Sequence, residues 1–434
     1  MKFPATGVIL GFLFSILIGC TAGKINKSNA PYALQNEFII MAYSGPPLEE
    51  TNLQRFREIA EAGIEILVPG NGVFNAGQNL KAMDLAQQVG IRIIPVDLRL
   101  FQFALNPDIV VDAALVKDVV NDYKNHPALA GYLIKDEPAA GMFPALKEIT
   151  GLFRKEDPLH EPVINLLPSY GSPVQLGSDD YPAYIKSFIT TVKPGLLSYD
   201  NYALREGVTW YDPWYADLAV VREETKKFRI PYIVFIQSEG IRNGLRVPNR
   251  AEILWQINTA LAYGAHGVGW FCYWTPESDQ GFKPEEGMPP PLVEAHYNAM
   301  IDISGKRTEV YDFVREANFY LKKAGKELLL WNNTDAARYE SGKMVEPGSS
   351  PVITPSGDSA NLVIGTFKKE NRCRIVLSNS RCDIPSVFTI RVSPEWKING
   401  ILTSIDALPT GDKSSLLQWK LEPGGSVVLE LQPK

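Results

Sequence analysis

Residues 231–240 read PYIVFIQSEG, an unbroken apolar run that ends in polar residues and a glutamate. Residues 129–138, LAGYLIKDEP, have the same arrangement. A short apolar run without alternation is typical of a parallel strand that is buried on both faces. The polar residues after each run would then lie at the carboxyl end of a strand, where α/β proteins place their functional groups.

Six further runs of this kind occur around these two, and amphipathic helical patterns separate them. The eight predicted strands span residues 38–46, 64–70, 92–99, 129–138, 162–170, 196–204, 231–240 and 266–276. The first helix is predicted over residues 52–62 and the last over about 292–323. Eight strand–helix units within about 290 residues predict a closed (β/α)8 barrel over residues 37–324. An open doubly wound sheet is the alternative, but residues 44–47, SGPP, offer few backbone amides to a phosphate.

The sequence pattern changes after Gly325. Apolar and polar residues alternate in segments such as NLVIGTF (361–367), VFTIRV (387–392) and GSVVLEL (425–431), starting with ELLLWNN at 327–333. Alternation of this kind is typical of antiparallel strands with one buried face. The pattern predicts a small antiparallel β-sandwich over residues 325–434.

The composition excludes several classes of protein. The chain has 434 residues and a formal net charge of −6, so it lacks the basic surface that a nucleic-acid binder needs. It contains only 4 His and 4 Cys, which argues against a multi-histidine metal site or a disulfide scaffold. We therefore expect no metal and no cofactor, and we look to carboxylates for the chemistry.

The N-terminus has the features of a bacterial lipoprotein signal. Lys2 precedes an apolar run from Val8 to Ile18, and residues 17–20 read LIGC. The run is too short to span a membrane comfortably, and LIGC resembles a lipobox. We predict a signal peptide over 1–19, lipidation of Cys20 and a tether over 20–36; an ordinary signal peptide followed by an incidental cysteine is the alternative. The protein would then be anchored in the bacterial cell envelope by lipid alone, and the lack of Asp after Cys20 favours the outer membrane.

Three further cysteines remain. Cys373 and Cys382 flank a predicted strand and turn. An oxidising envelope compartment would let them form a disulfide, and two unrelated small residues are the alternative. Cys272 lies within an apolar strand and is expected to be buried and inert.

Polar residues at the predicted strand ends are the candidates for chemistry. They are Tyr43, Asn71, Asp97, Arg99, Asp136, Glu137, Asn165, Tyr170, Asp200, Tyr202, Gln237, Glu239, Trp270, Trp274 and Glu277. Glu137 and Glu239 follow the fourth and seventh strands, which lie nearly opposite each other around a barrel mouth. Two carboxyl groups suit acetal cleavage, because one protonates the leaving oxygen while the other attacks or stabilises the oxocarbenium-like centre.

With these residues in place, the chain resembles the clan A glycoside hydrolases over about residues 38–324. Residues 131–138, GYLIKDEP, are similar to the strand-four motif of that clan. Residues 236–240, IQSEG, are similar to its strand-seven motif. The resemblance implies a retaining mechanism with Glu137 as the acid/base and Glu239 as the nucleophile.

The resemblance also implies substrate contacts. Trp274 matches an aromatic platform that ends strand eight, and Tyr202 matches the residue on strand six that orients the nucleophile. Asn165 and Gln237, at the ends of strands five and seven, are further candidates. Asp136 stands where the clan usually has an asparagine that contacts the sugar 2-hydroxyl; an acid there still accepts hydrogen bonds, and its charge would help to keep Glu137 protonated. No arginine of the clan is evident on the early strands, and Arg99 is a weak candidate.

Three hypotheses follow. The first is a retaining glycoside hydrolase that acts on β-linked polysaccharide or oligosaccharide, with β-glucan as the leading substrate. The second is a non-catalytic glycan-binding lipoprotein on a degenerate barrel, which the missing asparagine before Glu137 supports. The third is a barrel hydrolase or isomerase that uses Asp97 and Asp200.

Overall fold

The structure is a computed structural model, and it describes residues 33–100, 112–242, 244–276, 296–348, 352–409 and 416–434. The described residues belong to one compact unit. The predicted signal peptide and Cys20 lie outside them. The end of the predicted tether is part of the fold: residues Ala33–Asn36 form a short 3-10 helix, η1, and Leu34 is buried among side chains inside the barrel.

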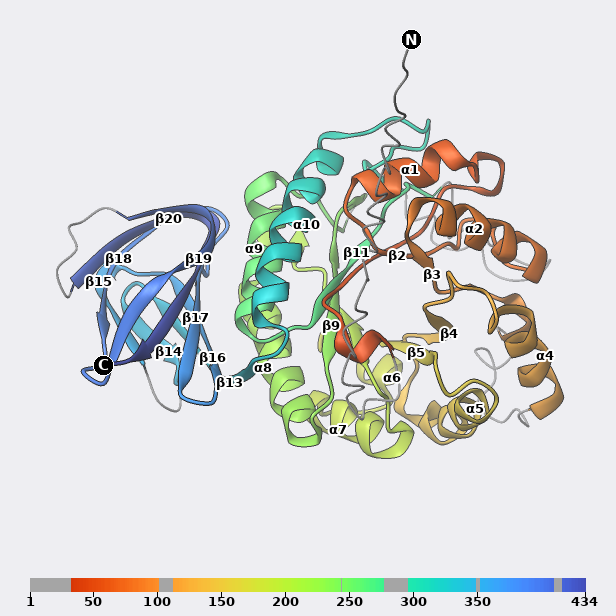
Figure 1. Cartoon of the computed structure of the whole chain (residues 1–434), viewed down its shortest axis with the longest axis horizontal. Helices are drawn as coiled ribbons and strands as arrows, with labels where there is room; N and C mark the ends of the chain where they lie inside the picture. Colours follow the sequence, from red (N-terminus) through yellow and green to blue (C-terminus); the bar gives the residue numbers. More distant parts are fainter. Residues whose placement is uncertain (1–32, 101–111, 243, 277–295, 349–351, 410–415) are drawn as a thin grey trace, which may run out of the picture. The chain divides into compact units, whose positions relative to one another are not determined.

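The first domain is an eight-stranded parallel barrel, as predicted (Figure 1). Its strands are β1 (Ile39–Tyr43), β2 (Ile66–Val68), β3 (Arg92–Ile93), β4 (Gly131–Asp136), β5 (Glu161–Leu166), β6 (Leu197–Asp200), β9 (Tyr232–Gln237) and β11 (Gly267–Phe271). They are paired in the order β3-β2-β1-β11-β9-β6-β5-β4. A parallel bridge between Ile93 and Leu129 joins the two ends of this order and closes the barrel.

A helix follows each of the eight strands and covers the barrel from outside (Figure 1). These helices are α1 (Leu53–Glu61), α2 (Ala76–Val89), α4 (Ala113–Tyr123), α5 (Phe143–Glu156), α7 (Tyr181–Val192), α8 (Tyr211–Phe228), α9 (Arg250–Ala262) and α10 (Glu309–Leu328). A short helix, α6 (Pro173–Leu176), precedes α7, and two further 3-10 turns, η2 (Leu48–Glu50) and η3 (Ala140–Met142), precede α1 and α5. Short two-stranded ladders extend the loops: β7 (Leu204–Arg205) pairs with β8 (Val208–Thr209), and β10 (Gly240–Ile241) pairs with β12 (His296–Tyr297).

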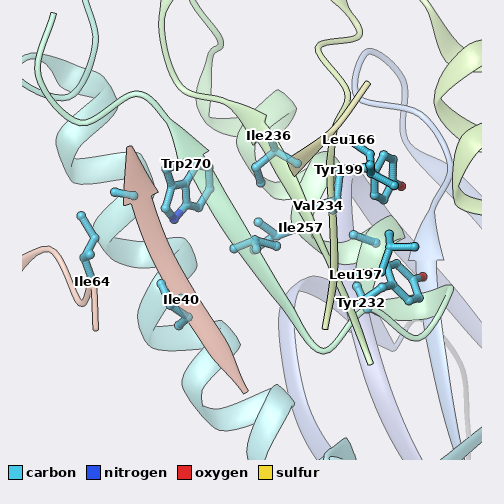
Figure 2. Close-up of a cluster of buried hydrophobic side chains, with 14 of the residues drawn as sticks. Ile40, Ile64, Leu166, Leu197, Tyr199, Tyr232, Val234, Ile236, Ile257 and Trp270 are labelled. Atoms are coloured by element: carbon cyan, nitrogen blue, oxygen red, sulfur yellow. The ribbon is translucent and has the colours of Figure 1, made fainter. Parts of the chain in front are cut away.

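Alternate residues of each barrel strand enter two separate apolar layers. Ile233 and Phe235 of β9 point inward, whereas Val234 and Ile236 pack against the helices. Figure 2 shows the outer layer, in which the strand side chains meet Ile257 of α9. At the carboxyl ends of the strands the inward positions become polar, and this places Asn165 and Asp200 at the mouth.

The last barrel helix differs from the prediction. It spans Glu309–Leu328 instead of starting near residue 292, and it includes Glu327 and Leu328, which the sequence assigned to a strand. The delay has a local cause: Asp302 accepts hydrogen bonds from the backbone N–H groups of Ser304 and Lys306, which forms a turn in place of a helix. Residues 292–295 lie outside the described residues.

The C-terminal domain is antiparallel, as predicted. Its strands are β13 (Asn332–Glu340), β14 (Lys343–Glu346), β15 (Ile353–Ser359), β16 (Leu362–Lys369), β17 (Arg372–Asn379), β18 (Ser386–Val392), β19 (Trp396–Pro409) and β20 (Leu416–Pro433). They form one hydrogen-bonded sheet in the order β14-β13-β16-β17-β20-β18-β15, with β19 paired to β20. The long strand β20 pairs with β17 through residues 426–431 and with β18 through residues 416–421, so the sheet bends around its own apolar core.

Helix α9 joins the two domains. Every residue from Glu252 to Ala262 is buried, because one side of the helix faces the barrel and the other faces the C-terminal sheet. Asn258 Nδ2 donates to the carbonyl of Gly424 at 2.8 Å, and Trp255 Nε1 donates to the carbonyl of Ser380 at 3.1 Å. A helix that is buried on all sides does not need a polar face toward solvent. The two hydrogen bonds attach the C-terminal sheet to this helix of the barrel.

Candidate active site

The end of β4 presents two adjacent carboxylates. Asp136 is its last residue, and the exposed Glu137 follows with a positive φ of 48°. The N–H of Glu137 donates to the carbonyl of Asn165 at 2.8 Å, which ties this turn to β5. A left-handed backbone is unfavourable for a residue other than glycine and occurs often at functional sites. The side chain of Glu137 is exposed at this turn.

Asn165 connects Asp136 to a third carboxylate. Its Nδ2 donates to Asp136 Oδ1 and to Asp200 Oδ1, each at 3.1 Å. Its Oδ1 accepts from Ser198 Oγ at 2.8 Å, which fixes the orientation of the amide. Asn165 was predicted as a substrate contact, and in the structure its amide is occupied in holding two acids.

Crowding of these carboxylates changes their acidity. Burial raises the pKa of Asp200 well above its ordinary value, and the nearby charges of Glu137 and Asp136 raise it further. The pKa of Asp136 is also raised, because the packed mouth desolvates the carboxylate although part of the side chain is accessible. Lys135 lies close to Asp136 and Glu137, and burial lowers its pKa. The cluster therefore holds two carboxyl groups, Asp136 and Asp200, whose pKa values are raised above their ordinary range.

Three half-buried aromatic side chains lie beside the carboxylates. The ring of Phe271, at the end of β11, stacks against Tyr202 at 5.3 Å and against Tyr43 at 6.0 Å between ring centroids. Burial raises the pKa of the Tyr202 hydroxyl well above its ordinary value, and the charges of Asp200 and Glu137 contribute to this rise. Tyr202 is therefore close to the carboxylates of β4 and β6, whereas the sequence placed it beside Glu239.

Glu239 follows β9 and is held by two side chains. Its Oε1 lies 2.7 Å from Nδ1 of His296, and its Oε2 accepts from the thiol of Cys272 at 3.0 Å. The carboxylate has no exposed surface, and its residue is 0% accessible. The antiparallel pairing of β10 with β12 carries His296 to this position. No local spacing in the sequence links residue 296 to residue 239, so this contact could not be predicted from the sequence.

Gln237 acts on the backbone of the surrounding loops. Its Nε2 donates to the carbonyls of Leu204, Glu239 and Arg246, and its Oε1 accepts from the N–H of Leu204. The side chain is fully buried. It was predicted to contact substrate, and this geometry instead makes it a brace between the loops that follow β6 and β9.

Trp274 is buried, with 2% of its surface exposed. The guanidinium of Arg55 lies 4.9 Å from the centre of its ring, and Gly305 packs close to the same ring. This packing does not favour the sugar platform that the sequence predicted for Trp274. Tyr43, Tyr202 and Phe271 are half-buried and do offer aromatic surface at the mouth.

Asp97 and Arg99 form an ion pair at 2.7 Å. Burial opposes ionisation of Asp97, but hydrogen bonds from Arg99 and Tyr123 outweigh it and lower its pKa. Asp97 shares none of these partners with Asp200, which is held by Asn165. The hydrogen bonds of Asp97 and Asp200 therefore give the third hypothesis no support.

The described cysteines are free. Cys373 lies in the core of the C-terminal sheet, whereas the thiol of Cys382 is 3.1 Å from the hydroxyl of Tyr211 on α8. The possible disulfide between them is not formed, because the strand and the turn direct the two side chains to different surroundings. Cys272 is buried as expected, but it contacts Glu239.

Two further features of the described residues concern ligands and membranes. No group of three or more His, Cys, Asp or Glu is placed there to hold a metal ion. Within the same part of the chain, no helix combines the length and the apolar character needed to cross a bilayer.

No family model matches the chain, and no curated protein matches its sequence. Solved structures do match. A GH42 β-galactosidase from G. stearothermophilus, determined as a catalytic mutant, is 9% identical with a TM-score of 0.56, and the match covers 92% of this chain and 98% of that chain. A β-galactosidase from Bacillus circulans sp. alkalophilus is 10% identical with a TM-score of 0.54, covering 91% of this chain and 100% of the other. An Anoxybacillus α-amylase is 12% identical with a TM-score of 0.50, covering 92% and 99%. At these identities the similarity establishes the (β/α)8 fold.

Proposed function

We propose that this protein is a retaining glycoside hydrolase that cleaves β-linked polysaccharide or oligosaccharide by double displacement. Glu137 would act as the acid/base and Glu239 as the nucleophile. The observation that carries the proposal is the pair of glutamates at the carboxyl ends of β4 and β9, on a fold that this chain shares with glycoside hydrolases.

The surroundings of the two glutamates suit different roles. Glu137 is exposed and lies beside Asp136 and Lys135, so it can reach the oxygen of a leaving group. Glu239 is fixed by His296 and Cys272, which contact its two carboxylate oxygens, one each. A nucleophile must be held near its attack geometry, and hydrogen bonds from neighbouring side chains supply this constraint.

The aromatic surface supports a carbohydrate ligand. The rings of Tyr43, Phe271 and Tyr202 form a continuous stack at the mouth. Apolar faces of sugars pack on aromatic rings while their hydroxyls need polar partners. Asp136 is such a partner, and β-glucan is the leading substrate within this class. The lipid anchor at Cys20 and a place in the bacterial cell envelope, with the outer membrane favoured, belong to the same proposal.

The test is hydrolysis of a panel of β-linked glycans by the wild type and by Glu137→Gln and Glu239→Gln, followed by NMR of the products. We expect both variants to lose activity by at least about a thousandfold, because each removes a group needed in the transition state. Retention of anomeric configuration in the first product supports double displacement. Asp97→Asn is a control, and full activity in both glutamine variants would refute the proposal.

The complete burial of Glu239 favours a second candidate, a glycan-binding protein without catalysis. In that case the aromatic stack would bind sugar while the second carboxylate served the fold. Binding of a β-glycan without turnover, unchanged in Glu239→Gln, would select this candidate over hydrolysis.

A further inference from the structure

Arg205 lies in the loop that follows β6, between two aromatic rings. The centre of its guanidinium is 4.3 Å from the ring of Trp210 and 5.0 Å from the ring of Tyr170. The two rings also contact each other edge to face at 5.5 Å. We call this arrangement of Arg205, Tyr170 and Trp210 the arginine shelf.

The charge of Arg205 is not balanced by any ion pair among the described residues. Its Nε is buried and has no hydrogen-bond partner. The other described arginines without an ion pair are all exposed, so water solvates them; they are Arg57, Arg229, Arg242, Arg315 and Arg391. Arg205 is half-buried, and a half-buried cation without an anion or a full hydration shell is costly.

The shelf is held rigidly at the mouth. Gln237 bonds to both the N–H and the carbonyl of Leu204, next to Arg205. Arg246 donates to the carbonyl of Arg205 and also pairs with Glu252. The hydroxyl of Tyr170 accepts from the N–H of Tyr202 at 2.8 Å, so the shelf adjoins the aromatic stack described above. A ligand that lies on Tyr202 therefore extends toward Arg205.

A planar guanidinium with fixed orientation recognises carboxylate and sulfate through paired hydrogen bonds. The carboxylates of Asp136, Glu137 and Asp200 lie close to Tyr202 and would repel such a group. A substrate with an anionic group would thus be oriented, with its charge on the shelf and its scissile bond at the carboxylates.

We propose that the arginine shelf is a subsite for an anionic substituent, a carboxylate or a sulfate, on the glycan that occupies the mouth. This inference rests on the proposed function and specifies its substrate class as an acidic glycan. If the inference is correct, the protein binds a charged glycan more tightly than a neutral one, and this preference depends on Arg205.

Binding by the Glu137→Gln variant, measured by calorimetry, tests the inference without turnover. The probes are a neutral β-linked oligosaccharide, the same backbone with one uronate carboxylate, and the same backbone with one sulfate ester. We expect at least one charged probe to bind about tenfold or more tightly than the neutral probe, since hydrogen bonds between charged groups are worth this much. The stronger of the two charged probes identifies the anion.

Adding Arg205→Gln should abolish the preference and leave the affinity for the neutral probe unchanged. Arg205→Lys keeps the positive charge but loses the paired N–H donors of the guanidinium, so we expect an intermediate preference for the charged probe. Arg242→Gln is the matched control, because it removes an exposed positive charge from the neighbouring loop after β9. The preference should also weaken as salt concentration rises.

The outcomes separate the two proposals. Turnover of neutral glycan without any charge preference overturns the shelf and leaves the hydrolase proposal standing. If a charged probe binds in a manner that depends on Arg205 but the wild type shows no turnover, the arginine shelf stands and the hydrolase proposal is overturned. Equal losses in Arg205→Gln and Arg242→Gln, or no binding of any probe, overturn the inference, and the melting temperature of each variant shows whether it is folded.

Discussion

At the scale of single residues, Glu239 depends on a histidine that lies 57 positions further along the chain. His296 Nδ1 and the Cys272 thiol contact different oxygens of the same carboxylate. If Glu239 is the nucleophile, these two side chains determine its angle of attack. His296 would then be a positioning residue, because it acts on substrate only through Glu239.

We predict that His296→Phe lowers kcat about 10- to 100-fold and leaves KM nearly unchanged, because one hydrogen bond to a charged group is lost. Phenylalanine preserves the edge contact of residue 296 with Phe271. His296→Asn retains a donor near the position of Nδ1 and should recover part of the activity. Steady-state kinetics of the three proteins measure this, and an equal loss in both variants would point to a purely structural role.

Asp217 provides a pH test at the same scale. It is fully buried on α8, and its Oδ2 accepts from the N–H of Ser169 and from Asn201 Nδ2. Burial raises its pKa to about 6 from 3.8. The folded state therefore binds a proton more tightly than the unfolded state, so stability that is present below about pH 4 is lost as the pH rises through 6.

Relative to Asp217→Asn, the wild type should lose up to about 3 kcal/mol of unfolding free energy between about pH 4 and pH 7. Asparagine can keep an oxygen for both donors and carries no charge to bury. Urea unfolding of the two proteins across this range gives the difference directly. A constant difference would show that Asp217 has the same pKa in both states.

At the scale of the element, α9 is buried from Glu252 to Ala262 and has a well-defined start. Asn249 accepts from the N–H of Glu252, and Glu252 accepts in return from the N–H of Asn249. This capping box satisfies two N–H groups that no intrahelical partner can reach. Glu252 also pairs with Arg246, so the cap links the helix to the loop beneath the arginine shelf.

Asn249→Ala should therefore lower the free energy of unfolding by about 1 to 2 kcal/mol. The control is Asn52→Ala, at the start of α1, where the asparagine accepts from the N–H of Arg55 in an exposed position. We expect a smaller loss there, because water can replace the cap. Chemical denaturation of both variants tests the difference, which would disappear if the start of α9 were frayed.

At the scale of the whole molecule, the barrel and the C-terminal sheet share one buried helix. Gly365 of β16 is required by this contact: a Cβ at this position would lie 2.1 Å from the carbonyl oxygen of Ala262. Asn333 of β13 also donates to that carbonyl. The two domains are therefore expected to unfold together.

Gly365→Ala should lower the free energy of unfolding of both domains, in a single transition, by about 2 kcal/mol or more. The added methyl group would collide with the backbone of Ala262, and neither β16 nor α9 can move aside without shifting the sheet. Gly400→Ala, on β19, is the matched control, because nothing lies within 4 Å of a Cβ there. Calorimetry of the two variants distinguishes them. Separate melting of the domains in the wild type would contradict a shared unfolding unit.

Much of this architecture was predictable because its signals are local. Runs such as PYIVFIQSEG have the length and the continuous apolar character of buried parallel strands, and eight of them imply a barrel. The error in the start of α10 also has a local origin. The predicted helix over residues 292–323 includes Asp302, whose side chain accepts hydrogen bonds from nearby backbone N–H groups and forms a turn there.

The candidate site was predictable only in part. Glu137 and Asp136 are consecutive and end a strand, so their place at the mouth follows from the chain itself. Whether a side chain is buried depends on segments that are distant in the sequence. Contacts with such segments let Gln237 connect two loops and place Arg55 over the ring of Trp274. The same is true of Asn165, whose two acceptors come from β4 and β6.

The sequence by itself determined the barrel, the antiparallel C-terminal domain and the strand ends that carry the glutamates, because strand and helix periodicity depends on neighbours along the chain. Only the tertiary structure decided which carboxyl groups have raised pKa values, which carboxylate is held by His296, and which half-buried arginine has no ion-pair partner among the described residues. Those properties arise from desolvation and from contacts between segments far apart in the chain, and no local pattern records them.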